Sequence, residues 1–284
     1  DGDTIRSVDM TTIIFFESSS VSHKIVLHLE NGEIEFYGSL KEIEEQEHVT
    51  ILHAVESGSR AWGFASPDSD YDVRFIYVRT MEDYLRLDEP RDVIEWQMDE
   101  VLDINGWDLR KTLKHFHRGN ATLFEWGNSP VVYKTTDTWS RIHDAASPCF
   151  SVKAAIHHYC GTAGNTFSQF LQEDLVRYKK YFYALRPLLA GRYILEHRCP
   201  PPVLFDDLMK MEMPVDLRAG IEELLEIKKK SGESQRGKRI PVIQEFIEQE
   251  LERQKAAASA LGDDRMDGWE ELNHVFLETL EMLD

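Results

Sequence analysis

The sequence is poor in the features that stabilise secreted or membrane-spanning proteins. Its 284 residues include three cysteines, Cys149, Cys160 and Cys199, without a closely spaced pair, so neither a disulfide framework nor a structural zinc site is expected. It has no run of about 18 uncharged apolar residues, and its first residues lack the basic, apolar and small-residue order of a signal peptide. We therefore expect a soluble, cytoplasmic protein that does not enter a membrane.

Basic residues are scarce relative to acidic ones. Lys and Arg total 32 against 51 Asp and Glu, which gives a formal net charge of −19. Such a field repels polyphosphate and argues against a protein that coats nucleic acid non-specifically. Local basic clusters must therefore bind any anion. The densest joins Lys228–Lys230 to Arg236, Lys238 and Arg239, and it is either a landing site for RNA or a solvated loop.

The chain has enough apolar residues for one large or two modest globular domains, since 42% are hydrophobic and 29% charged. Residues 1–38 are expected to form a β-rich extension with a type I′ hairpin at Asn31-Gly32. Residues 39–146 are expected to form an α+β domain with a small mixed sheet. The composition shifts near Ser147-Pro148, and residues 147–284 are expected to be all-helical.

Hydrophobic patterning places the individual elements. The α+β part is expected to hold a short helix at 40–47, strands at 48–55, 71–78, 92–96 and 100–104, the last of them before Asn105-Gly106, and a helix at 107–117. Long helices are expected at 156–170, 175–195, 217–230 and 242–261.

Two carboxylates with strand spacing are the first sign of chemistry. In Asp70-Tyr71-Asp72 the acids are two residues apart, so on a strand they point to the same face. Oxygen ligands placed in this way suit Mg²⁺ or Mn²⁺. Tyr71 would point to the opposite face.

A glycine-serine pair and a third acid complete the pattern. Gly58-Ser59 follows a buried strand, where backbone N–H groups and a hydroxyl can hold phosphates. Asp103, flanked by apolar residues, is the preferred third acid. Asp108 is the competitor, although an acid at the start of a helix often only caps it.

Each motif taken alone has an ordinary structural explanation. An Asp-x-Asp pair is common on solvated turns, and a Gly-Ser pair is less specific still. The order of the motifs carries more weight, because a buried strand, Gly-Ser, a short spacer, paired acids entering a strand and an acid on a later strand occur in succession.

The stretches 56–63 (ESGSRAWG) and 66–74 (SPDSDYDVR) resemble the nucleotidyltransferases of bacteria and phages associated with RNA repair, which belong to the DNA polymerase beta superfamily. The stretches 106–111, 119–126 and 179–189 are also similar to that family, and the resemblance spans roughly residues 45–280. It implies a polymerase-beta-type catalytic domain followed by a helical substrate-binding domain. It also implies a phosphate-binding motif and three metal ligands. These are Gly58 and Ser59 for phosphate, and Asp70, Asp72 and Asp103 for metal.

Other residues are candidates for contacts to the nucleotide. Arg60 and Ser69 lie beside the motif, as does Arg74; for both arginines a salt bridge to an acid is an equal alternative. Lys111 begins the helix after the third acid, and a solvated helix face is its alternative. Three residues spaced i, i+4 and i+7 share one face of a later helix. They are Lys179, Tyr183 and Arg186.

The expected activity is transfer of a nucleoside monophosphate from a nucleoside triphosphate to an acceptor hydroxyl, with an RNA end as the preferred acceptor and Mg²⁺ or Mn²⁺ as cofactor. A small molecule or a protein side chain is the alternative acceptor. A catalytically silent nucleotide-binding module is the alternative from another class.

Overall fold

A mixed β-sheet forms the centre of the described chain. The structure is a computed structural model that describes residues 7–8, 11–14, 26–29, 32–35, 40–66, 68–98, 102–230 and 235–283. Within these residues one sheet has five strands in the order β7-β8-β6-β5-β9. Their bounds are β5 Thr50–Glu56, β6 Tyr71–Val78, β7 Val93–Met98, β8 Leu102–Asp108 and β9 Val132–Thr135. β6 and β8 run parallel and the other neighbours antiparallel, so the expected mixed sheet is confirmed.

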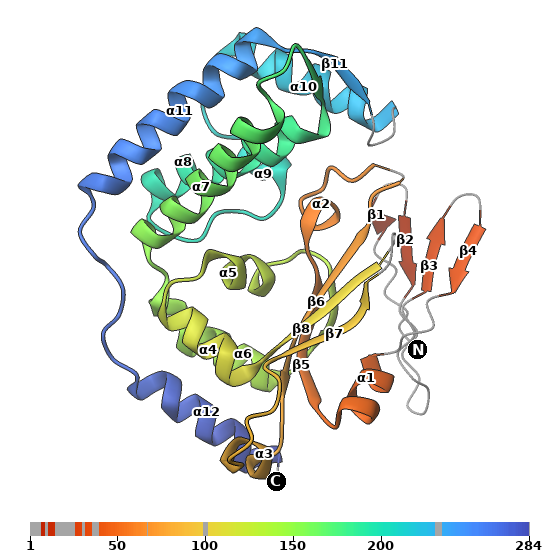
Figure 1. Ribbon diagram of the computed structural model, residues 1–284, viewed down its shortest axis with the longest axis vertical. Coiled ribbons are helices and arrows are strands. Elements are labelled where there is room, and N and C mark those ends of the chain that lie inside the picture. Colours follow the sequence, from red (N-terminus) through yellow and green to blue (C-terminus); the bar gives the residue numbers. More distant parts are fainter. Residues whose placement is uncertain are drawn as a thin grey trace.

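Both faces of this sheet are buried, because side chains alternate across it. On β6, Phe75 and Tyr77 join one apolar cluster and Ile76 and Val78 join another. The first face is covered by the short helix α1 (Leu40–Glu47). The second is covered by α4 (Leu109–His117), α5 (Ala121–Gly127) and α6 (Asp137–Ala146). Figure 1 shows these three helices together beside the strands.

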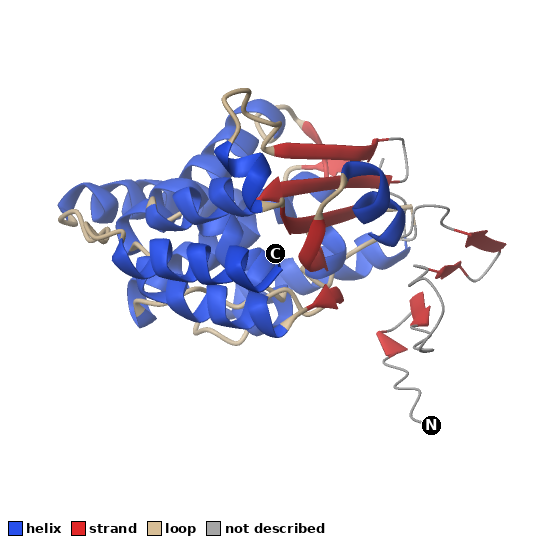
Figure 2. Ribbon diagram, turned by 90° about the horizontal axis from the view of Figure 1, so that it is seen from below, coloured by secondary structure: helices blue, strands red, loops and turns tan. Residues whose placement is uncertain are grey.

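A second group of helices follows the 3₁₀ turn η1 (Ser147–Cys149). It consists of α7 (Val152–Phe170), α8 (Lys179–His197), α9 (Phe205–Leu208), α10 (Val215–Lys230) and α11 (Pro241–Ala260). Ser151 caps α7, since its hydroxyl accepts a hydrogen bond from Ala154 N at 3.0 Å. These helices enclose an apolar cluster of their own, which Phe64 of the sheet region also enters. Figure 1 shows them together at the top of the view, above the central strands, and Figure 2 shows that most helices of the molecule lie on one side of the strands.

The last helix, α12 (Glu270–Leu283), packs back against α6 and α4. Leu272, Val275 and Leu280 thereby complete the apolar cluster of the sheet. We call residues 40–146 together with α12 the sheet half, and residues 152–260 the helical half. Residues 147–284 are therefore not all part of one helical body, although the proposed division at Ser147-Pro148 stays a prediction.

Four N-terminal strands form a separate antiparallel sheet. They are β1 Ser7–Val8, β2 Thr11–Ile14, β3 Val26–Leu29 and β4 Gly32–Glu35. β3 pairs with β4 in a register that brings Leu29 opposite Gly32, which confirms a hairpin at the expected position. Asn31 lies outside the described residues, so the type of turn stays a prediction.

Three expected element bounds are wrong. Asn105-Gly106 lies inside β8, which continues to Asp108, and α4 begins only at Leu109. Gly106 is required there by packing, because an added Cβ would lie 2.1 Å from the Phe75 ring. The segment 175–177 is the strand β10, which pairs with β11 (Arg236–Lys238), so α8 starts at Lys179.

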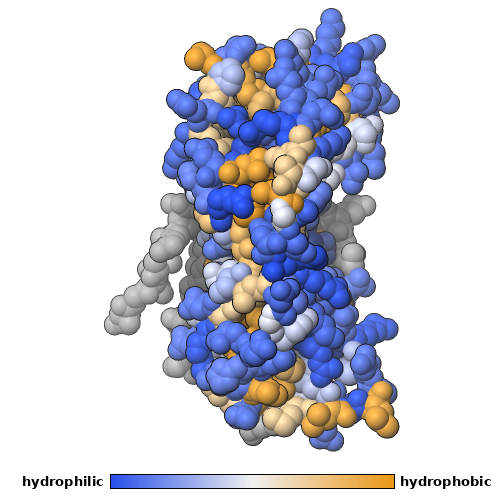
Figure 3. All heavy atoms as spheres, turned by 90° about the vertical axis from the view of Figure 1, so that its left-hand side faces the viewer, coloured by the Kyte–Doolittle hydropathy of each residue, from blue (hydrophilic) through white to orange (hydrophobic). Residues whose placement is uncertain are grey.

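The surface of the described chain is mainly hydrophilic, as the high content of charged residues leads one to expect. In the described chain no helix is long and apolar enough to span a membrane. On the face seen in Figure 3, hydrophilic side chains predominate and apolar ones gather in smaller groups between them. The large apolar side chains that are exposed include Leu85, Leu87, Trp269 and Leu277.

A buried histidine joins the central sheet to the helices that cover it. His53 on β5 is 4% exposed and stacks on Trp139 of α6, with 4.6 Å between ring centroids. Its Nε2 lies 3.3 Å from the Trp126 carbonyl oxygen and its Nδ1 lies 3.2 Å from Thr135 Oγ1. Burial lowers the pKa of His53 to about 4 from its ordinary value of 6.5, and nearby His143 adds to the shift.

From the lowered pKa of His53 we predict that the protein loses stability in mild acid. Because the folded pKa lies below the unfolded one, the unfolded chain binds the proton more tightly, and stability falls as the pH falls through 6.5 towards 4. We expect the free energy of unfolding to drop by about 2 kcal/mol between pH 7 and pH 5 from this group. Urea titrations of wild type and His53→Asn at both pH values give the difference. An equal drop in the two proteins would assign the acid sensitivity to other groups.

Candidate active site

Gly58 brings the backbone against a carboxylate. It follows β5 and opens the single-turn helix α2 (Gly58–Ala61) with φ of +62°, a left-handed conformation that disfavours other residues. An added Cβ would lie 2.1 Å from Asp72 Oδ2. Ser57 N donates to the Asp72 carbonyl oxygen at 2.8 Å, and the Ser59 side chain is 5% exposed. The Gly-Ser segment therefore packs directly on the entry to β6.

Asp72 and Asp103 face each other across two parallel strands, since the register of β6 and β8 makes them Cα partners. Arg74 Nη2 lies 3.1 Å from Asp72 Oδ1 and 2.6 Å from Asp103 Oδ2. Arg74 Nη1 also donates to the Asp103 carbonyl oxygen at 2.8 Å. The two carboxylates thus converge on one cation, each with about a third of its side chain exposed (31% and 33%).

Asp70 adds a third negative charge at the start of β6, where it is exposed. Burial raises the pKa of Asp72, Arg74 opposes the rise, and the charges of Asp103 and Asp70 add to it. The three acids therefore lie within one another's fields, and their hard oxygen donors match Mg²⁺ or Mn²⁺. In the part of the chain that the structure describes, no three His, Cys, Asp or Glu side chains are already arranged around one point as metal ligands.

Asp108 lies far from this convergence. It ends β8 five residues after Asp103, about 17 Å along a strand. Its carboxylate accepts hydrogen bonds from Arg110 N at 2.7 Å and from Tyr84 Oη at 2.8 Å, so it caps α4 as the alternative explanation supposed. The geometry therefore places Asp103, and not Asp108, beside Asp72.

Arg60 and Ser69 shape the turn that carries Asp70. Arg60 Nη2 donates to the Ser69 carbonyl oxygen at 2.6 Å and its Nε donates to the Asp70 carbonyl oxygen at 3.1 Å. The guanidinium lies over the Tyr71 ring at 3.6 Å. The Ser69 hydroxyl accepts from Ser66 N at 2.9 Å. Both side chains thus organise the backbone leading into the paired acids.

Glu56 is a functional candidate that the sequence motifs did not single out. It ends β5, is 1% exposed, and its Oε1 accepts a hydrogen bond from Asp72 N at 2.8 Å. Its other oxygen accepts from the Tyr133 hydroxyl. Burial raises the pKa of Glu56 to about 7, against the opposing hydrogen bonds from Tyr133 and Asp72 N. Its place at the end of a buried strand was visible in the sequence, but its contact with Asp72 depends on strand pairing.

Helix α8 places one of its three predicted residues against the Gly-Ser segment. The Tyr183 ring meets Trp62, which follows α2, edge-on with centroids 5.7 Å apart. Lys179 is the first residue of α8 and is half-buried. Lys180 lies over the Tyr183 ring at 5.3 Å.

Arg186, predicted to bind nucleotide from the same face, is instead buried in the helical half. It is 1% exposed, pairs with Glu125, and lies 4.7 Å from the Trp62 ring. The helix is enclosed on all sides near this residue, so its i+7 position turns inward. Its guanidinium is thus engaged with Glu125, and the contact of Arg186 with a ligand stays a prediction.

Lys111 is also far from the carboxylates. It lies in the first turn of α4, beyond Asp108, and its Nζ is 3.1 Å from Asp92 Oδ1. Because β8 runs on to Asp108, α4 begins at the opposite end of the sheet. The expected position of Lys111 in the cleft is therefore wrong.

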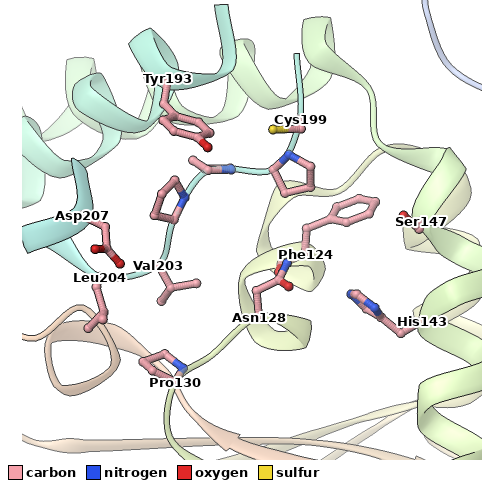
Figure 4. Close-up of a pocket in the computed structure, with 13 residues that line it drawn as sticks. Phe124, Asn128, Pro130, His143, Ser147, Tyr193, Cys199, Val203, Leu204 and Asp207 are labelled. Carbon is pink, nitrogen blue, oxygen red and sulfur yellow. The ribbon is translucent and has the colours of Figure 1, made fainter. Parts of the chain in front are cut away.

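A pocket of about 540 Å³ lies between α5, α6 and α8 (Figure 4). Each of these helices or its C-cap contributes to the lining, through Phe124 and Asn128, His143, and Tyr193. Much of the remaining wall is formed by the segment 199–204, together with Pro130, Ser147 and Asp207. None of the candidate metal ligands is among its lining residues. Just beyond the lining residue Leu204, Phe205 N donates to the carbonyl oxygen of Trp62, the residue that follows α2, at 2.9 Å.

A mixed sheet that joins a glycine-serine turn to acids on adjacent strands is the arrangement expected of a polymerase-beta-type nucleotidyltransferase fold. The comparisons agree. Residues 33–278 match the model of the RNA repair pathway DNA polymerase beta family, and the chain belongs to that family. Family membership indicates a nucleotidyltransferase-like role.

Two relatives differ greatly in how much of this chain they resemble. The uncharacterized protein YcgL of Bacillus subtilis (strain 168) is 44% identical over 244 residues, which cover 85% of this chain and 94% of that protein. Accessory gene regulator protein A of Staphylococcus aureus is 53% identical over 38 residues, which cover 13% of this chain and 16% of that protein. The second likeness is thus confined to a short stretch of both chains.

We predict that substitution of Gly58 weakens metal binding. Gly58→Ala places a methyl group on Asp72 Oδ2 and also strains the backbone, whereas Gly63→Ala strains a backbone of φ +83° with Leu204 Cδ2 3.2 Å away. Both variants should lose about 1–2 kcal/mol of stability. Isothermal titration with Mn²⁺ should show weakened binding in Gly58→Ala alone. Equal metal affinities in both variants would contradict the role given to the glycine.

We predict that substitution of the buried Arg186 lowers the stability of the fold. Arg186→Met leaves the Glu125 carboxylate, whose side chain is 13% exposed, without its cationic partner and with only the Tyr159 hydroxyl donating to it. The loss should cost about 3 kcal/mol. The double variant Glu125→Gln/Arg186→Met should recover most of that loss in denaturant titrations. A stable single variant with a raised KM for nucleotide would instead show that Arg186 reaches the ligand.

Proposed function

We propose that this chain is a metal-dependent nucleotidyltransferase that moves a nucleoside monophosphate from a nucleoside triphosphate to an acceptor hydroxyl and releases pyrophosphate. The observation that supports it most is the pairing of Asp72 with Asp103 in register across β6 and β8, against a Gly58 that has no room for a side chain. Membership of the polymerase beta family points the same way.

The acids would hold Mg²⁺ or Mn²⁺ through Asp70, Asp72 and Asp103. When bound, such ions stabilise charge on the attacking and leaving oxygens of phosphoryl transfer. In the metal-free protein, Arg74 takes that part by balancing the carboxylates of Asp72 and Asp103. Glu56 fixes the backbone of Asp72 through the amide hydrogen bond and so sets the direction of its side chain.

The nucleotide would lie between the Gly-Ser segment and α8. Ser59 and the amides around Gly58 are proposed to steady the phosphates that leave as pyrophosphate. Arg60 acts mainly through the turn that it holds, since its guanidinium already contacts two carbonyl oxygens. Lys179 and Tyr183 are proposed to contact triphosphate or base from α8.

In the proposed reaction, a new bond joins the acceptor oxygen to the α-phosphorus while the bond from that phosphorus to the β-phosphate oxygen breaks. Asp103 is proposed to take the proton of the acceptor hydroxyl, because its carboxylate is partly exposed beside Asp72. An RNA end is the preferred acceptor because the family description names RNA repair. A small-molecule or protein acceptor is the alternative within the same chemistry.

Substitution of the acids tests the proposal. We expect Asp72→Asn and Asp103→Asn each to reduce transfer of α-labelled nucleotide to acceptor RNA by about 100-fold or more, because both remove charge that would hold the metal. Asp108→Asn is the matched control, since the same change occurs 17 Å or so further along β8. It should keep most of the activity after allowance for any loss of stability.

The readouts are labelled product and pyrophosphate, measured with each nucleoside triphosphate in Mg²⁺ or Mn²⁺. Undiminished transfer by Asp103→Asn together with loss in Asp108→Asn would reverse the assignment of the third acid. A different result would favour the catalytically silent binding module. In that case nucleotide and Mg²⁺ raise the melting temperature, but no pyrophosphate is released with RNA, small-molecule or protein acceptors.

A further inference from the structure

Helix α4 lines a pocket at the end of the sheet opposite the candidate active site. The pocket has a volume of about 210 Å³ and is rich in cationic side chains from this one helix. Its basic lining residues are Arg110, Lys111, Lys114, His115 and Arg118. Its acidic ones are Glu89, Asp92 and Asp108.

The cations differ in how far they are already engaged. Arg110 donates to the Tyr84 carbonyl oxygen at 2.9 Å and lies over that ring at 4.6 Å, and Lys111 pairs with Asp92. The side chains of Lys114 and Arg118 are exposed, and within the described residues neither side chain makes a hydrogen bond or an ion pair. Two charged donors at the rim of the pocket are thus open to a ligand.

The spacing of these charges makes the like-charged side chains repel one another, and the Lys111–Asp92 pair offsets that repulsion for Lys111. Lys111 and Lys114 are i, i+3, and Lys114 and Arg118 are i, i+4, so like charges face each other on the helix. The pKa of His115 is lowered by burial and then by the charges of Arg118 and Lys111. The chain as a whole has a net charge of −19, so these four Lys and Arg residues within nine positions stand against the overall acidic composition.

We propose that the α4 pocket binds the phosphate backbone of the polynucleotide acceptor, a role that rests on the function proposed above. The pocket includes Asp108, which β8 joins directly to Asp103, about 17 Å away along the strand. At the spacing of about 3.4 Å per phosphate along one strand of a B-form duplex, that distance corresponds to about five phosphates. The acceptor end would then lie at the acids while upstream phosphates contact Lys114 and Arg118.

The other basic cluster offers less to a polynucleotide. Lys228 is 6% exposed and donates to Ser66 Oγ at 2.9 Å, and Arg239 lies 3.5 Å from Asp174. Arg236 and Lys238 belong to the short β10–β11 ribbon of the helical half and are exposed. They therefore serve as the comparison pair in the test.

Salt dependence of RNA binding tests the proposal without any need for turnover. Anisotropy of a labelled single-stranded RNA of 12 nucleotides gives log K against log salt concentration for each protein. Removal of two phosphate contacts should reduce the steepness of that slope by about 1.4, or 0.7 per contact. We expect this in Lys114→Gln/Arg118→Gln, with NTP and Mg²⁺ still raising the melting temperature as in wild type.

The matched control is Lys210→Gln/Lys255→Gln, which makes the same change of charge at side chains 77% and 60% exposed on the helical half. Its slope should equal that of wild type, as should that of Arg236→Gln/Lys238→Gln. An unchanged slope in the α4 variant, an equal change in the Lys210/Lys255 control, or a change confined to the Arg236/Lys238 variant would overturn the proposal.

Ligand length separates a backbone site from a site for a small phosphate compound. A trinucleotide should bind wild type and the α4 variant alike, because it is too short to reach from the acids to α4. Full displacement of the 12-nucleotide RNA by inorganic phosphate at an equal concentration of phosphate groups would overturn the proposal. Binding of RNA through α4 without any nucleotidyl transfer would refute the proposed function and leave the α4 site standing.

Discussion

The parallel pairing of β6 with β8 is the constraint on which the candidate site depends. It is the pairing that makes Asp72 and Asp103 neighbours, although 30 residues of chain and the edge strand β7 lie between them in sequence. Antiparallel pairing of the same strands would reverse β8 and carry Asp103 to the other end of the sheet. Burial is the main cause of the raised pKa of Asp72, and the charge of Asp103 adds to it. The apolar clusters on both faces of the sheet hold the strands in this register in spite of that repulsion.

Several groups around Asp72 and Asp103 offset that repulsion or hold the backbone in place against it. Arg74 supplies the opposing charge, while Glu56 and the backbone of Ser57 hold Asp72 by its amide and carbonyl groups. Arg60 holds the preceding turn in the same way. The backbone of the site is thus fixed by hydrogen bonds, whereas the carboxylate oxygens of Asp72 and Asp103 contact the Arg74 guanidinium. A metal ion is able to take the place of that cation.

Local pattern was enough to predict the strands β5 and β6, the helix α1 and the glycine-serine turn, because alternation, turn residues and buried runs lie within a few residues of one another. It failed where long-range packing decides. Asn105-Gly106 read as a turn, but the Phe75 ring of the neighbouring strand fills the space beside Gly106 and keeps the segment in β8. The shared helical face of Tyr183 and Arg186 was predicted correctly as a spacing, yet burial of Arg186 against Glu125 depends on a helix 61 positions away.

The connection between α11 and α12 has a mechanical consequence. Asp264 in this connection accepts hydrogen bonds from the Ser151 hydroxyl at 2.6 Å and from Val152 N at 2.8 Å. The chain crosses from the sheet half to the helical half just before Ser151 and crosses back just after Asp264. Asp264 therefore ties the two covalent links between the halves to each other. A second tie lies at α10, where Lys228 donates to Ser66 Oγ in the segment that leads to the paired acids. The ends of the helical half are thus fastened to the sheet half at both the chain crossings and the approach to the candidate site.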